Sequence, residues 1–186
     1  SCGAWRRRPA RASGAGSIGI ANYSTSLQSA TLILGNETGR ITNIKINAAI
    51  GVDSTGYDGA LGTNTALVMT SLGNSTTITS SYSGISTGIQ NNNFSTLELQ
   101  PLTSTEETNY FTLSGFTTGI ANIGTDSSEV IFANNARIIG STTGILNQNA
   151  GVLLFSGTIN SSVANSVGIN YTTTTAGNTL DISAGT

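Results

Sequence analysis

The chain has very little charge and lacks several residue types on which protein chemistry often depends. Only 9% of its 186 residues are charged, against about a quarter in an average globular domain. It contains no histidine, one methionine, two prolines and a single cysteine, Cys2. One cysteine excludes an internal disulfide. The absence of histidine excludes both a Ser-His-Asp triad and a zinc site of the Cys/His kind. We therefore expect neither a metal nor a cofactor.

The first sixteen residues differ in composition from the rest. Residues 1–16 hold four of the seven basic residues and the only tryptophan. No apolar stretch follows Arg6, so this segment does not resemble a signal peptide, and no apolar run reaches the ~18 residues of a membrane helix. A basic arm for nucleic acid is the alternative, but no basic face supports it. We interpret 1–16 as a disordered basic leader or junction sequence, and 17–186 as one domain with no nucleic-acid partner and no membrane insertion.

What the chain does have is a short phrase, glycine–isoleucine–any residue–asparagine, that recurs at intervals of 24 to 37 residues. Between successive phrases lie an alternating apolar run, such as TLIL (31–34) or VLLF (152–155), and a looser third apolar segment. No repeat has the period of a helix. The phrases are GIAN (19–22), GIQN (88–91), GIAN (119–122) and GILN (144–147), with the shorter relatives GVD (51–53) and GIN (168–170).

Three short strands per repeat predict an all-β fold, a right-handed parallel β-helix of about five to six three-strand coils. In such a solenoid each strand pairs with the equivalent strand of the next coil, because strands this short are not stable as isolated hairpins. We expect each glycine to take a positive φ at a corner and each isoleucine to pack inside. The asparagines then form an amide ladder from coil to coil, namely Asn22, Asn91, Asn122, Asn147 and Asn170.

The passages RIIGSTTGILN (137–147) and SGTINSSVANSVGIN (156–170) resemble the GTI-x-G…GI-x-N repeats of bacterial autotransporter passenger regions. The resemblance covers about residues 17–186. It implies a right-handed β-helix that is exported and displayed on the cell surface or released, often as an adhesin or toxin. It also implies a fragment of a longer passenger, without the translocator barrel. The expected location is therefore extracellular or at the bacterial surface, and the expected partner is a host-cell surface protein or glycan. Open β-helix ends would allow self-association.

Two insertions interrupt the repeat and are the predicted binding segments, since binding residues concentrate on loops. The first, DSTGYDGALGTN (53–64), and the second, PLTSTEETN (101–109), carry carboxylate, amide and aromatic side chains. The candidate binding residues are Asp53, Tyr57, Asp58, Glu106, Glu107 and Asn109.

The function predicted from sequence is that of a non-enzymatic binding scaffold, but two alternatives belong to other classes. β-Helical lyases and hydrolases of polysaccharides need clustered carboxylates with a basic partner. Asp53 with Asp58, and Asp126 with Glu129, are the closest pairs along the chain, and no arginine aligns with either. An ice-binding solenoid needs a threonine array that repeats with the coil, and runs such as YTTTT (171–175) do not recur in that way.

Overall fold

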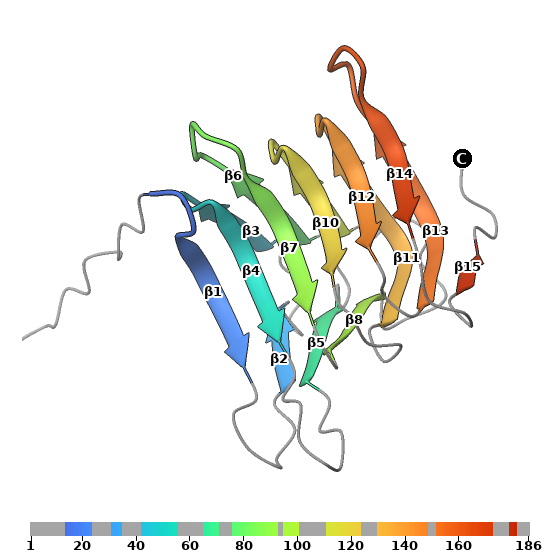
Figure 1. Cartoon of the computed structure of the whole chain (residues 1–186). Helices are drawn as coiled ribbons and strands as arrows, with labels where there is room; N and C mark the ends of the chain where they lie inside the picture. Colours follow the sequence, from blue (N-terminus) through green and yellow to red (C-terminus); the bar gives the residue numbers. More distant parts are fainter. Residues whose placement is uncertain are drawn as a thin grey trace, which may run out of the picture.

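The computed structural model consists of β-strands and their connections. It describes residues 14–23, 31–34, 42–55, 65–70, 76–92, 95–100, 111–123, 130–148, 152–172 and 179–181. Within these ranges there is no helix, and every strand pair is parallel. The strands form two sheets, and those of the first sheet lie side by side in chain order from β1 to β14 (Figure 1).

The first sheet is built from the repeated phrases. It has six strands in the order β1-β4-β7-β10-β12-β14, and each glycine-containing phrase lies inside one of them. Equivalent residues are paired across neighbouring strands, as Ile89 is with Ile120, and Ile120 with Ile145. The strands are β1 (Ile18–Tyr23), β4 (Ile50–Thr55), β7 (Thr87–Asn92), β10 (Thr118–Ile123), β12 (Thr143–Gln148) and β14 (Val167–Thr172).

The second sheet has nine strands and contains two rows, which correspond to the two other apolar segments of each repeat. Two long strands, β11 and β13, belong to both rows, since the first part of β11 pairs with β8 and its second part with β9. The strands are β2 (Thr31–Leu34), β3 (Thr42–Ile46), β5 (Thr65–Thr70), β6 (Thr76–Ser80), β8 (Ser95–Gln100), β9 (Phe111–Ser114), β11 (Val130–Ile139), β13 (Val152–Asn160) and β15 (Thr179–Asp181).

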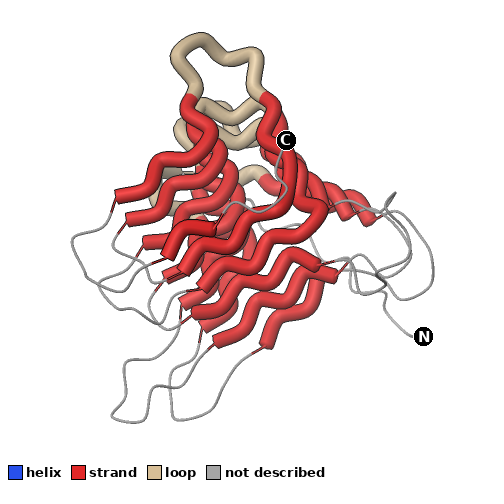
Figure 2. The backbone as a smooth tube through the Cα atoms, turned by 90° about the vertical axis from the view of Figure 1, so that its right-hand side faces the viewer, coloured by secondary structure: helices blue, strands red, loops and turns tan. Residues whose placement is uncertain are grey.

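The chain alternates between the sheets, so it returns to the first sheet one strand further along after each repeat. Figure 2 shows the resulting stack of strands. The predicted all-β fold of parallel strands is confirmed, and the arrangement is consistent with a β-solenoid-like fold. The repeats that begin at Gly119 and Gly144 are the shortest. They are also the ones in which two strands are continuous, as β11 and β13, because few residues remain there for a loop.

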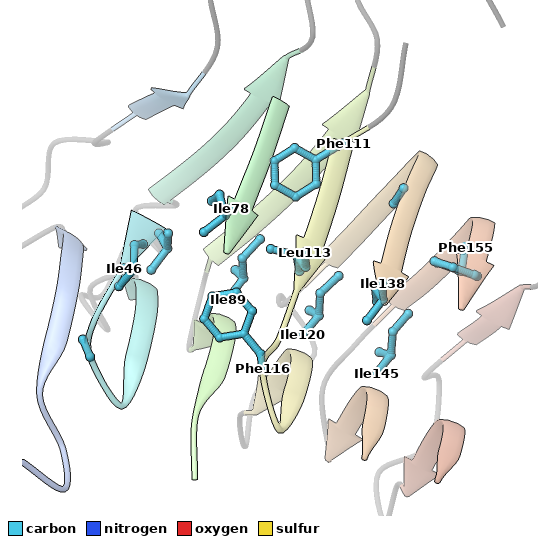
Figure 3. Close-up of a cluster of buried hydrophobic side chains, with 13 residues drawn as sticks. Ile46, Ile78, Ile89, Phe111, Leu113, Phe116, Ile120, Ile138, Ile145 and Phe155 are labelled. Atoms are coloured by element: carbon cyan, nitrogen blue, oxygen red, sulfur yellow. The ribbon is translucent and has the colours of Figure 1, made fainter. Parts of the chain in front are cut away.

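The core lies between the two sheets (Figure 3). Its first-sheet side is a row of isoleucine and valine side chains, of which Ile89, Ile120 and Ile145 are fully buried. Ile78 and Leu113 line the second-sheet side. Burying each such side chain stabilises the fold by roughly 1.5–3 kcal/mol. A strand turns every second side chain to the same face. The residue two positions after each isoleucine therefore also points inward, and in the phrase that residue is the asparagine.

The prediction that the phrase glycines take positive φ is wrong. Positive φ occurs among the described glycines at Gly14, Gly16, Gly115 and Gly140, none of which begins a phrase. The phrase glycines are needed for space instead. A Cβ at Gly51 would lie 2.5 Å from the carbonyl oxygen of Gly88 and 3.2 Å from Cε1 of Phe116. A side chain at this position would therefore collide with the neighbouring strand and with the core.

Phe116 explains part of this crowding. It lies in the short connection between β9 and β10, is almost completely buried, and belongs to the core cluster. Its ring lies against both Gly51 and Gly88. The aromatic ring thus fills volume that the glycines leave empty, and the two features depend on each other.

The predicted leader lies largely outside the described residues, which begin at Gly14. Residues 14–17 form a turn in which the Ser17 amide and hydroxyl both donate hydrogen bonds to the Gly14 carbonyl, at 3.1 and 2.8 Å. Ser17 is also bonded to β4 of the following repeat, because its carbonyl accepts a hydrogen bond from the Ile50 amide at 2.8 Å. Within the described residues, bonding between repeats therefore starts at Ser17.

Candidate functional site

The most elaborate polar arrangement among the described residues surrounds Asp53 in β4. Its carboxylate accepts hydrogen bonds from Tyr23 Oη at 2.7 Å, from Asn92 Nδ2 at 2.8 Å and from Thr55 Oγ1 at 3.2 Å. Asn92 also donates to Thr55 Oγ1 at 3.2 Å. These four residues come from β1, β4 and β7, three adjacent strands of the first sheet. We refer to them as the Asp53 cluster.

The Asp53 cluster lies on the face of the first sheet that points away from the core. Asp53 stands between Val52 and Ser54, which are both fully buried, and alternation along a strand places Asp53 on the opposite face. Tyr23, Thr55 and Asn92 are partners in one register row, two residues further along their strands. Parallel, in-register stacking therefore brings together side chains that are 30 and 39 residues apart in the chain.

The side chain of Asp53 is buried, whereas its hydrogen-bond partner Tyr23 is exposed to solvent. Only 6% of Asp53 is exposed, but 45% of Tyr23 is. Partial burial, the hydrogen bond to Asp53 and the charge of that carboxylate together raise the pKa of Tyr23 from 10.0 to about 12. Tyr23 is therefore neutral at physiological pH and presents an aromatic face, with its hydroxyl fixed as a donor to Asp53.

The sequence-based placement of Asp53 in a loop is wrong. The structure puts it inside strand β4 and shields it with three donors. The phrase GVD (51–53) contains a signal for this position. It lacks the spacer residue, so Asp53 is two residues after glycine instead of three and lies on the opposite face of the strand from the asparagines. The other binding candidates, Tyr57, Asp58, Glu106, Glu107 and Asn109, lie outside the described residues.

The predicted asparagine ladder is present in the middle of the first sheet. Asn91 Nδ2 donates to Asn122 Oδ1 at 2.8 Å, and Asn122 Nδ2 donates to Asn147 Oδ1 at 2.7 Å. All three side chains are fully buried. A buried amide without a partner would cost about 1–3 kcal/mol, so the stacking of identical amides makes these inward polar positions compatible with a core.

The ends of the ladder differ from the prediction. Asn22 donates to Ser54 Oγ at 3.2 Å, so a serine occupies the row in β4. Asn170 is not in the row at all. Tyr171 is the register partner of Asn147, while Asn170 pairs with Leu146 and is exposed. The phrase GIN (168–170) is one residue short, and because strand side chains alternate, one residue changes the face.

The described residues contain no group of three or more histidine, cysteine, aspartate or glutamate side chains that could hold a metal. Nor do they include a helix long and apolar enough to cross a membrane. Comparison of the chain with protein-family models, with curated proteins and with solved structures gives no match.

Proposed function

We propose that the chain is a segment of a secreted or surface-displayed passenger, folded as a right-handed β-helix of five to six three-strand coils. On this proposal it acts without catalysis, as an extracellular scaffold that presents its outer face and loops to a binding partner. Support comes from the parallel stacking of the repeated phrases and from the passenger-type repeats in the sequence.

The partner we propose is a neutral glycan, and the site is the Asp53 cluster. The observation that carries this proposal is the pairing of an exposed aromatic ring, Tyr23, with amide, hydroxyl and carboxylate groups held by mutual hydrogen bonds. Sugars offer apolar C–H faces that pack on aromatic rings, and hydroxyls that both donate to and accept from such groups. The carboxylate of Asp53 disfavours an anionic polysaccharide through like-charge repulsion.

Preorganisation of the cluster also favours binding. Asn92 is held by two hydrogen bonds, to Asp53 and to Thr55, and the three strands that carry the cluster are fixed by continuous pairing. Binding would therefore cost little ordering of side chains, which otherwise consumes about 0.5–1.5 kcal/mol for each one immobilised. A shallow, rigid surface of this kind suits repeated weak contacts along a polymeric ligand.

A glycan array with neutral and acidic members, followed by calorimetric titration of the hits, tests the proposal. We expect neutral glycans to bind, and Tyr23→Ala to weaken the affinity by about ten-fold, on the order of one aromatic contact. The matched control is Gln148→Ala, because Gln148 is exposed and lies in the same register row as Tyr23, four strands further along the sheet. Equal effects of the two substitutions, or binding only to acidic glycans, would overturn the assignment of the site.

The location is tested separately, by antibody labelling of intact cells of the source organism. Surface labelling supports the passenger proposal, whereas labelling that requires permeabilised cells contradicts it. This outcome is independent of whether a glycan binds.

A further inference from the structure

Beside the Asp53 cluster, the outer face of the first sheet changes from polar to apolar side chains. Ala121 and Ile123 alternate in β10 with side chains that are fully buried, so they point away from the core. Leu146 in β12 lies between two fully buried residues and points the same way. We refer to Ala121, Ile123 and Leu146 as the aliphatic patch.

The aliphatic patch is separate from the hydrophobic core. Ala121 is only 2% exposed, yet it does not belong to the core cluster, and neither Ile123 nor Leu146 packs against that cluster. Ile123 and Leu146 are each partly exposed. Apolar side chains that are grouped on an outer face, and not scattered singly over it, indicate a surface that meets a ligand.

In-register pairing joins the aliphatic patch directly to the Asp53 cluster. Ile123 is the register partner of Asn92, and Ala121 is the partner of Gln90, which is in turn the partner of Asp53. Adjacent strands lie about 4.8 Å apart. β7, β10 and β12 each pair with a strand on both sides. The polar and apolar groups therefore form one continuous surface on strands that are fully paired.

The strands β4, β7, β10 and β12 carry only one charged residue, Asp53. Its carboxylate is bonded to three donors, and the residue is 6% exposed. A ligand group that covers the aliphatic patch is therefore uncharged, since a charged group would lose water there and gain no partner. Gln90 is partly exposed and offers an amide donor and acceptor at the border between polar and apolar side chains.

We propose that Gln90 and the aliphatic patch bind the acetamido group of an N-acetylated neutral sugar. This inference rests on the function proposed above, a neutral glycan held at the Asp53 cluster, and it specifies a substituent of that glycan. The acetamido methyl group packs on Ile123 and Leu146, while its N–H donates to the Gln90 amide and its carbonyl accepts from it. A sugar that carries only hydroxyl groups leaves the aliphatic side chains without an apolar partner.

An acetamido group fits this surface better than other apolar substituents of sugars do. A methyl ether or a deoxy sugar offers a methyl group but no hydrogen-bond donor, so it would cover the Gln90 carbonyl oxygen without pairing it. An N-acetyl group combines a methyl group, a donor and an acceptor in one planar unit. It therefore complements an amide that stands beside two aliphatic side chains of the next strands, Ile123 and Leu146.

Calorimetric titration of the full chain with two matched tetrasaccharides tests the proposal. Chitotetraose and cellotetraose have the same linkage, and each sugar of the first carries an acetamido group where the second carries a hydroxyl. We expect chitotetraose to bind about ten-fold more tightly, because the methyl group is buried and a further hydrogen bond forms. Equal binding of the two would overturn the acetamido assignment and leave the neutral-glycan proposal standing. Binding of neither would contradict both.

Ile123→Thr tests the aliphatic patch itself. Threonine keeps the β-branched shape and replaces apolar carbons by a hydroxyl, so affinity for chitotetraose should fall about five-fold while affinity for cellotetraose stays unchanged. Thr79→Ala, at a partly exposed position on the second sheet, is the matched control and should change neither affinity. The unfolding midpoint of each variant verifies that it folds. An equal loss for both sugars, or self-association of the parent that Ile123→Thr abolishes, would refute the proposed subsite.

Discussion

The side-chain amide of Asn122 donates a hydrogen bond to Oδ1 of Asn147 at 2.7 Å, inside the core and between strands that are 25 residues apart in the chain. Asn122 also accepts a bond from Asn91 at 2.8 Å. Each end of this one amide is therefore bonded to an identical side chain. The repeated asparagine joins neighbouring repeats by polar bonds, in the same strands in which the isoleucines join them by apolar packing.

Asn122→Ala should therefore be strongly destabilising. The substitution removes two buried hydrogen bonds. Asn147 Oδ1 loses the amide that donates to it, and Asn91 Nδ2 loses the oxygen that accepts from it. We therefore expect a loss of about 2–4 kcal/mol in the free energy of unfolding. Urea denaturation measures it. Asn170→Ala is the control, because Asn170 is exposed and outside the inner row; its effect should stay within about 0.5 kcal/mol. Comparable losses at the two positions would refute a structural ladder.

Gly144→Ala should destabilise the fold, whereas Gly168→Ala should not, because a Cβ added at Gly168 meets nothing within 4 Å. A Cβ at Gly144 would lie 2.6 Å from Cγ2 of Ile159 and would also collide with the carbonyl oxygen of Gly168. Relieving such overpacking costs about 1–3 kcal/mol. Thermal unfolding of both variants at low protein concentration provides the comparison. If Gly144→Ala is neutral, the glycine row is not required for close approach of the strands.

Phe116→Ala should leave a cavity beneath the first sheet. Its ring is almost fully buried against Gly51 and Gly88, and truncation of such a residue typically costs about 3–5 kcal/mol. Ile85→Ala is a matched control in a neighbouring connection, because Ile85 is 82% exposed. The free energies of unfolding from urea curves should separate the two variants clearly. A small effect at Phe116 would mean that the core does not extend to this corner.

Tyr23 should ionise well above the ordinary range for tyrosine. Its pKa is raised from 10.0 to about 12, first by burial and then by the bond to Asp53 and its charge. A raised pKa means that the fold favours the neutral phenol, so this contribution to stability is complete below pH 10 and is lost as the pH rises from 10 to 12.

The titration of ¹³C-labelled tyrosine followed by NMR, with Tyr23→Phe to assign the signal, measures this pKa. Asp53→Asn should lower it only part of the way to 10.0, because burial, the largest cause, remains. An unmodified Tyr23 that ionises near pH 10 would show that the Asp53 cluster does not form in solution.

The sequence was sufficient to predict the stacking but not every position within it. Six phrases, each with glycine, an aliphatic residue and a polar residue at similar spacing, predicted parallel pairing of equivalent strands, and the register of Ile89, Ile120 and Ile145 agrees. The expectation of three strands in every repeat is wrong for two repeats, because the apolar segments expected as separate strands there are continuous in β11 and β13.

The errors arose where the phrase changes length. Because side chains alternate along a strand, the inner polar row is the third residue after each glycine. That count gives Tyr171 in place of the predicted Asn170, and it gives Ser54 in β4, where no ladder residue was predicted. The Asp53 cluster could not be predicted in detail. Its residues are far apart in sequence, and Tyr23 and Asn92 come together only through the register of three strands. The role of the phrase glycines was also hidden, because close packing and positive φ both favour the same residue.

The contact between neighbouring isoleucines tests the central claim, parallel in-register stacking of the repeats, most directly. In a methyl-labelled sample, nuclear Overhauser effects should connect Ile120 with both Ile89 and Ile145, since adjacent strands are about 4.8 Å apart. Ile89 and Ile145, separated by two strand spacings, should give a much weaker effect. In-register stacking thus predicts two strong contacts and one weak one. The absence of both Ile120 contacts would contradict in-register stacking. Contacts between Thr118 and Gln148, which an antiparallel arrangement would give, would also contradict it.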